Sequence, residues 1–192
     1  MIFLDLQDRR VIKTRSMLRN SLIQLMKERE LSSITVKQLC EMSCVNRGTF
    51  YLHYKDIFDM INHLEDELFF EFKQLIASHE QLDKDIDIKQ NFEYIYTFIS
   101  QNKDLFTVLL INNGQVSLIK RIVSLIYDKN LAYILKEFNP KDKDLFDKYY
   151  SFILYGLIGL IENWLSSGAM ESAKFMAAIT EQIIFNGLSF KK

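Results

Sequence analysis

Apolar residues return every three or four positions along most of the chain, a spacing that predicts amphipathic helices. One such segment runs from Asp8 to Glu30 and carries arginine and lysine on its other face. A second begins after Asp56, a residue suited to cap a long helix. The apolar positions are Val11, Leu18, Leu22, Leu25 and Met26 in the first segment and Phe58, Ile61, Leu64, Leu68, Phe72 and Leu75 in the second. Each stripe predicts a helix with one face packed on a core.

Between these two segments the pattern predicts two short helices separated by a tight break. Thr35 is a good N-cap for a helix over residues 36–42, and the sequence "SCV" interrupts that helix. Asn46 then caps a third helix that ends near His53. Later in the chain, helices are predicted over residues 88–101, 104–112, 115–138, 142–167 and 171–188.

The composition agrees with a wholly helical protein. A β-rich fold needs frequent turns, but the 192 residues include one proline and six glycines. Hydrophobic residues make up 48% of the chain, which is enough for a packed core. We therefore expect an all-α fold of about nine helices. A three-helix N-terminal domain is predicted over residues 8–56 and a helical C-terminal domain over residues 57–192.

Charge is divided unevenly between these two parts. Residues 9–55 contain ten lysines and arginines and three glutamates, a net charge of +7, whereas the whole chain carries −1. The remainder must therefore carry −8. A basic head on an acidic body favours a polyanionic partner for the head alone.

A helix, a tight break and a second short helix over residues 36–53 form the helix-turn-helix arrangement, which places its second helix in the DNA major groove. Arg47 suits a forked contact to guanine O6 and N7, and Gly48 permits close approach to the duplex. Thr49 suits a phosphate or a thymine methyl group. The predicted DNA-binding residues are Thr35, Lys37, Asn46, Arg47, Gly48, Thr49, Tyr51, His53, Tyr54 and Lys55.

Phosphate contacts account for most of the remaining members of that set. Tyr51, Tyr54 and Lys55 have the reach and the donors for phosphate oxygens. The start of the second helix, with Thr35 and Lys37, offers amides to another phosphate. For His53, a helix-capping or phosphate-binding role is open, and a metal role is not expected.

The apolar residues of this stretch are expected inside rather than on DNA. Core packing is favoured over base stacking for Phe50 and Leu52, and Leu39 and Val45 are interpreted in the same way. Tyr51 is expected to face outward, opposite the inward Phe50.

The run "RVIKTRSMLRNSLIQLMKERELSSITVKQLCEMSCVNRGTFYLHYKDIFDMI" resembles the N-terminal domain of the TetR/AcrR family of transcriptional regulators over about fifty residues. The entry "ITV", the segment "NRGTFYLHYKD" and the long helix after it carry the resemblance. The segments "FISQNKDLFTVLLINNG" and "GLIGLIENWLSSG" resemble a C-terminal domain of some of these regulators. One departure is Cys44, which stands where the family usually has glycine in the turn. If that position is left-handed, the side chain costs about 1 kcal/mol.

The resemblance implies a dimer with a small-molecule pocket in the helical body. It implies a repressor of a near-palindromic double-stranded DNA operator, in which effector binding changes the spacing of the two recognition helices and releases DNA. An activator of the same fold is the first alternative. The second is a protein-interaction module that retains the helix-turn-helix head.

The last two predicted helices suggest where a dimer would form. Their apolar content exceeds what one packed face requires, and small residues would allow helices to approach closely. A four-helix interface between two subunits is favoured over a purely intramolecular core. The residues predicted for this interface are Phe152, Tyr155, Gly156, Gly159, Leu160, Ala177 and Ile184.

No catalytic, metal or cofactor site is predicted. Cys40 and Cys44 lie one helical turn apart, but no second pair completes a zinc site. Cys40 is interpreted as a small buried hydrophobic residue, and a redox role remains open for Cys44. The effector and its pocket residues are not predicted. The longest apolar stretch is too short to span a bilayer, and the N-terminus does not follow a signal-peptide pattern, so a cytoplasmic location is expected.

Overall fold

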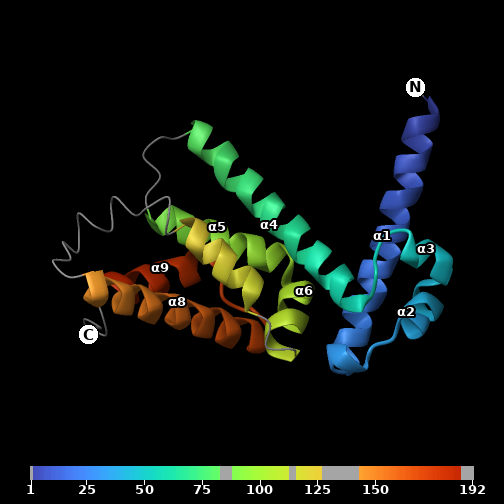
Figure 1. The fold of residues 1–192 in the computed structure, drawn as a ribbon. Helices are drawn as coiled ribbons and strands as arrows, with labels where there is room; N and C mark the ends of the chain where they lie inside the picture. The colour runs from blue at the N-terminus through green and yellow to red at the C-terminus, as the bar shows by residue number, and fades with distance from the viewer. Residues whose placement is uncertain (1, 83–87, 113–115, 127–142, 187–192) are drawn as a thin grey trace. The chain divides into compact units, whose positions relative to one another are not determined.

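The computed structural model describes residues 2–82, 88–112, 116–126 and 143–186, and every regular element within these ranges is a helix (Figure 1). The predicted all-α class is therefore confirmed. The chain divides into two compact units, the first formed mainly by residues 1–67 and the second by most of the residues that follow. The division falls within α4 (Ile57–Leu82), between Glu67 and Leu68.

The first unit is a small helical head. It contains α1 (Ile2–Glu28), the short 3₁₀ turn η1 (Leu31–Ser33), α2 (Val36–Ser43), α3 (Arg47–Tyr51) and the first part of α4. α1 begins at Ile2, six residues before the expected start. Its core is made of side chains with no exposed surface, among them Leu18, Leu22, Met26, Leu39 and Phe50.

The second unit contains the rest of the described helices. These are the end of α4, α5 (Ile88–Gln101), α6 (Lys103–Thr107), the π-helical turn η2 (Val108–Asn112), a helical stretch over residues 117–126, α8 (Lys143–Ser166) and α9 (Ala173–Asn186). The expected helix over 115–138 is described only as far as residue 126. The last two residues expected in the final helix, 187 and 188, also lie outside the described ranges.

A buried polar and aromatic cluster joins α5 to the helices beside it. The hydroxyls of Tyr96 and Thr180 are 2.7 Å apart, so one donates to the other across α5 and α9. The Tyr96 ring also packs edge-on against Trp164 of α8, with 5.3 Å between centroids. Burial raises the pKa of Tyr96 to about 12, and the Thr180 hydrogen bond opposes only part of this rise. The cluster therefore favours the neutral phenol.

The core face of α4 differs slightly from the predicted stripe. Ile61, Leu64, Leu68 and Phe72 are buried as expected, but Phe58 is exposed and Leu75 is half-buried. Their places in the core are taken by Ile57, Met60 and Ile76. The helix begins at Ile57. At each end, the buried position is one residue away from the predicted one: Ile57 in place of Phe58, and Ile76 in place of Leu75. No helix in the described ranges is both long enough and apolar enough to cross a membrane.

Candidate nucleic-acid interface

The start of α2 is fixed by a reciprocal cap. The Thr35 hydroxyl accepts a hydrogen bond from the Gln38 backbone N–H at 3.3 Å, and Gln38 Oε1 accepts from the Thr35 backbone N–H at 3.0 Å. This capping box satisfies two donors that a helix N-terminus leaves unpaired. Lys37, in the first turn, is exposed and lies 3.9 Å from Glu41 on the same face. Thr35 and Lys37 therefore stand at the helix end where the sequence predicts a phosphate contact.

Cys44, in the turn between α2 and α3, adopts the left-handed conformation in which the family usually has glycine. Cys44 has φ 54° and ψ 30°, and the Val45 backbone N–H returns to the Cys40 carbonyl at 3.1 Å. A residue with a Cβ carries a penalty of about 1 kcal/mol in this conformation, which glycine avoids. Cys44 is exposed, whereas Cys40 is buried, and burial raises the pKa of the Cys40 thiol.

α3 begins with a second side-chain cap. Asn46 Oδ1 accepts a hydrogen bond from the Gly48 backbone N–H at 2.7 Å. A Cβ on Gly48 would lie 3.2 Å from that same oxygen. Glycine at this position thus avoids crowding at the cap. The sequence suggests a second role, which is close approach to DNA.

Phe50 anchors the recognition helix on the head. Its ring is fully buried and lies 5.4 Å from the Tyr51 ring and 5.6 Å from the Tyr54 ring. With Phe50 inward, the exposed residues of this stretch include Arg47, Tyr51 and Lys55. Thr49 and His53 are half-buried beside them. The predicted orientation of Phe50 and Tyr51 is confirmed.

Two predictions for this stretch are wrong because of where the residues fall around the helix. The sequence predicts a phosphate contact for Tyr54, but only 2% of the residue is exposed. Its ring contacts His63 at 5.5 Å and lies 6.0 Å from the Arg15 guanidinium, and burial raises its pKa. Leu52 was expected in the core, yet it is 82% exposed. Tyr54 shares the inward face with Phe50, whereas Leu52 lies opposite Phe50.

The backbone near Lys55 is held by the start of α4. The Asp59 carboxylate accepts from the Lys55 backbone N–H at 2.9 Å, and Asp56 Oδ1 accepts from the Asp59 backbone N–H at 2.8 Å. The Arg15 guanidinium also pairs with the Glu67 carboxylate at 2.9 Å, which ties α1 to α4. The hydrogen bond to Asp59 fixes the backbone from which the exposed Lys55 side chain extends.

In the second unit, the predicted dimer residues fall into two groups. Phe152 is 72% exposed and Tyr155 is 58% exposed, and they share one face of α8 with Gly156 and Gly159. A Cβ added at either glycine would meet no described atom within 4 Å. These small residues are therefore not explained by close packing within the described protomer.

The other predicted interface residues are less accessible. Leu160 and Ile184 are half-buried. Ala177 is fully buried on α9, the helix that packs against α5, so the prediction that it contacts a second subunit is wrong. Its small side chain serves packing inside the protomer.

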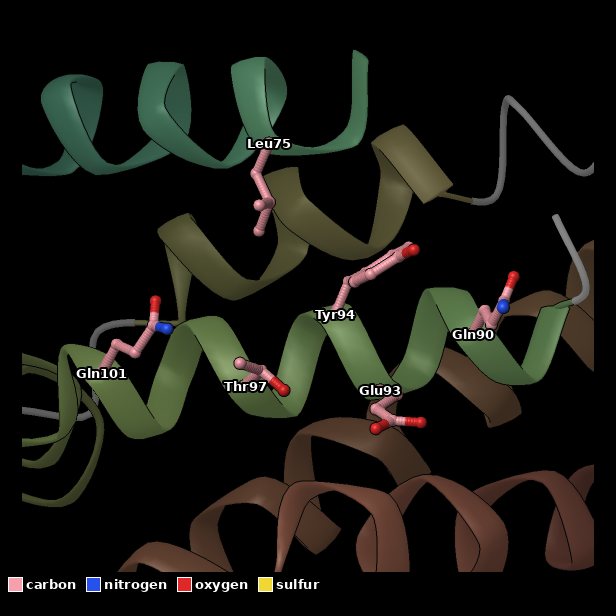
Figure 2. Close-up of a pocket in the computed structure, with 6 residues that line it drawn as sticks. All are labelled: Leu75, Gln90, Glu93, Tyr94, Thr97 and Gln101. Carbon is pink, nitrogen blue, oxygen red and sulfur yellow. The ribbon is translucent and has the colours of Figure 1, made fainter. Parts of the chain in front are cut away.

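The second unit also has a pocket of about 390 Å³ between α4 and α5. Figure 2 shows Leu75 of α4 pointing toward α5, and Tyr94 of α5 pointing toward α4. The lining residues are Leu75, Gln90, Glu93, Tyr94, Thr97 and Gln101. Five of the six lie on α5, and four of these recur at spacings of three or four residues, which places them on one stripe of that helix: Gln90, Tyr94, Thr97 and Gln101. Their amides and hydroxyls supply both hydrogen-bond donors and acceptors.

Comparisons with known proteins place this geometry in a family. The family model described as "Transcriptional regulator C-terminal region", of the TetR type, matches residues 86–186, which is more than half of the chain. The chain belongs to the TetR/AcrR family of transcriptional regulators. The resemblance of the C-terminal part to such regulators is thereby confirmed.

Two further comparisons agree with this assignment of the regulator. An uncharacterized HTH-type transcriptional regulator, YxbF of Bacillus subtilis, is 26% identical over 175 residues, which covers 86% of this chain. The match spans 42% of the length of that relative. The solved structure of the fatty acid degradation regulator FadR from Bacillus halodurans superposes with a TM-score of 0.65. It is 16% identical, with 93% of this chain and 97% of that one covered, and it shows that the two share a fold.

The head of the regulator brings the predicted DNA-binding residues together, with Tyr54 as the exception. Thr35 and Lys37 stand at the start of α2, and the other retained residues follow along α3 and the segment that leads to α4. Sequence reasoning missed Leu52, although its position two residues after a buried phenylalanine would have indicated it. Within the described ranges, no group of three His, Cys, Asp or Glu side chains is placed to hold a metal ion.

Proposed function

We propose that this regulator is a homodimeric repressor that leaves a near-palindromic operator when a small molecule binds its body. Residues 8–56 act as the DNA-binding domain and residues 57–192 as the regulatory and dimerisation domain. The observation that carries the proposal is a continuous exposed surface of the helix-turn-helix, with Arg47 and Tyr51 on the capped helix α3 and Lys55 in the segment that leads to α4. The net charge of +7 over residues 9–55 supports the same partner.

The residues of the head take different parts in binding DNA. Arg47 stands at the first position of α3 and reads guanine through O6 and N7. Tyr51, Lys55 and the start of α2 bind phosphates and fix the register of the head on the duplex. Since phosphate contacts carry no sequence information, specificity rests on the few side chains that reach base edges.

The exposed face of α8 is the proposed dimer interface. Phe152 is largely exposed in the protomer, beside two glycines with open space above them. Tyr155 is also exposed, although Lys120 lies over its ring and donates a hydrogen bond to its hydroxyl. A partner helix seated on this face would bury both aromatic rings and would approach closely at the glycines. The two-fold symmetry of such a dimer matches a near-palindromic operator.

The effector is proposed to act through α4. The pocket lies between α4 and α5, and α4 is one continuous helix that contributes its first part to the head and its last part to the body. A ligand that binds more tightly when α4 and α5 are separated would favour the conformation with displaced heads. The operator would then be released by a shift in population rather than by direct competition.

Fluorescence anisotropy of the purified protein tests this proposal. The probes are duplex DNA from upstream of its own gene and scrambled DNA of equal length, at several salt concentrations. Selective binding is expected, with a slope of log affinity against log salt near −0.9 for each phosphate contacted. Weak and equal binding to both duplexes would contradict operator recognition. A site upstream of the promoter core, where binding increases transcription, would favour the activator instead.

A further inference from the structure

The outermost ridge of the recognition helix is apolar. With 3.6 residues per turn, successive residues stand about 100° apart, so Gly48 and Leu52 both lie about 160° from the buried Phe50. Leu52 keeps helical geometry, with φ −73° and ψ −21°, and its backbone N–H bonds to the Gly48 carbonyl at 3.2 Å. The part of α3 that projects farthest from the core therefore ends in leucine methyl groups.

The polar residues of α3 lie on its shoulders rather than on this ridge. On the same geometry, Arg47 and Tyr51 stand about 60° and 100° from Phe50 on one side, and Thr49 stands about 100° away on the other. Gly48 contributes no side chain, because a Cβ there would crowd the Asn46 cap oxygen. Leu52, at 82% exposed, is thus the single side chain on the ridge between the two shoulders.

An apolar side chain at this place has one chemical complement in the major groove. Base edges there present hydrogen-bond donors and acceptors, together with the C5-methyl group of thymine. We infer that Leu52 contacts the C5-methyl group of a thymine in each operator half-site. This inference rests on the proposed DNA-binding function. Arg47 reads guanine beside this thymine, so each half-site pairs a polar contact with an apolar one.

Replacing thymine by uracil tests the contact directly, since uracil differs only by lacking the methyl group. The operator is first selected from randomised duplexes with the full-length protein. Each thymine of a half-site is then replaced singly by uracil and binding is measured by anisotropy. Loss of one buried methyl contact is expected to weaken binding about fourfold for one half-site and about fifteenfold for both.

The variant Leu52→Ala completes a double-substitution cycle. It should bind the thymine operator more weakly than the wild type by at least the same factor, and it should bind the thymine and uracil operators equally. Leu52→Met should keep a preference for thymine, because it retains apolar reach. Met170→Ala is the matched control: Met170 is 85% exposed in the loop between α8 and α9, and its loss should leave discrimination unchanged.

The outcomes separate this inference from the function on which it rests. A wild-type protein that selects an operator but binds every uracil duplex as tightly as thymine overturns the role of Leu52 alone. Discrimination that persists in Leu52→Ala overturns it as well. Failure to select any sequence overturns the proposed DNA reading and the inference together. A circular dichroism spectrum and melting curve like those of the wild type would show that Leu52→Ala remains folded.

Discussion

The head and the body of this regulator use exposed hydrophobic residues in different settings. In the head, Leu52 and Tyr51 are exposed at a short helix whose N-terminus is capped by the Asn46 side chain. In the body, Phe152 and Tyr155 are exposed along the middle of a 24-residue helix, beside glycines with open space above them. A short capped helix suits a surface that reads small features, whereas a long open face suits burial against another helix.

The largest expected effect comes from removing the Phe50 ring, which packs the recognition helix on the head. Phe50→Ala leaves a cavity where a fully buried ring now packs between Tyr51 and Tyr54. The free energy of unfolding of the head should fall by about 3–5 kcal/mol, and DNA binding should be lost with it. Urea unfolding followed by circular dichroism would measure the change. An unchanged midpoint for every transition would contradict the packing described here.

A second substitution addresses the body. Gly159→Arg places a long charged side chain in space that is open in the protomer, so folding should be preserved while the proposed interface is blocked. Sedimentation velocity should then show a monomer, and operator affinity should fall because two half-sites are no longer bound together. Met170→Arg, in the exposed loop after α8, is the matched control and should remain dimeric. A dimeric Gly159→Arg would place the interface elsewhere.

A third pair of substitutions separates the roles within the head. Arg47→Ala should weaken operator binding by about 1–3 kcal/mol and leave binding to random DNA nearly unchanged. Lys55→Ala should weaken binding to all sequences alike and should reduce the salt slope by about one phosphate contact. Anisotropy titrations on both duplexes measure each effect. Equal losses on operator and random DNA for Arg47→Ala would contradict its assignment to a base.

The smallest expected effect lies in the turn. Cys44→Gly removes a Cβ from a left-handed residue, which should raise the free energy of unfolding by up to about 1 kcal/mol. The greater freedom of glycine in the unfolded chain offsets part of that gain. Cys44→Ala retains the Cβ and is the control for loss of the thiol. A decrease in stability for Cys44→Gly, relative to Cys44→Ala, would show that the turn is not strained.

The sequence predicted the head more fully than the body because the signals in the head are local. The immediate neighbours of Thr35, Asn46 and Phe50 predict two helix caps and a buried ring, and the structure has all three. The errors at Leu52 and Tyr54 share one cause. Residue polarity favours an exposed Tyr54 and a buried Leu52, but position around the helix decides both, and a residue four places after Phe50 shares its face.

In the body, the outcome depended on packing between distant segments. As a small residue, Ala177 suits a subunit interface, but its side chain is fully buried within the protomer, on a helix that packs against α5. The pocket between α4 and α5 also needs two helices to be placed in space before its lining residues can be named. Helical periodicity identifies an apolar face, but it does not say which partner covers that face.

The central claim is that two copies of α3 read an operator through its major groove. Guanine methylation interference on the selected operator tests it most directly, because methylation at N7 removes the acceptor that Arg47 would use. We expect two groups of interfering guanines separated by about one DNA turn of roughly 10 base pairs, or by a small multiple. In Arg47→Ala, one guanine in each group should cease to interfere. Interference at no guanine, or a pattern unchanged in the variant, would contradict the account.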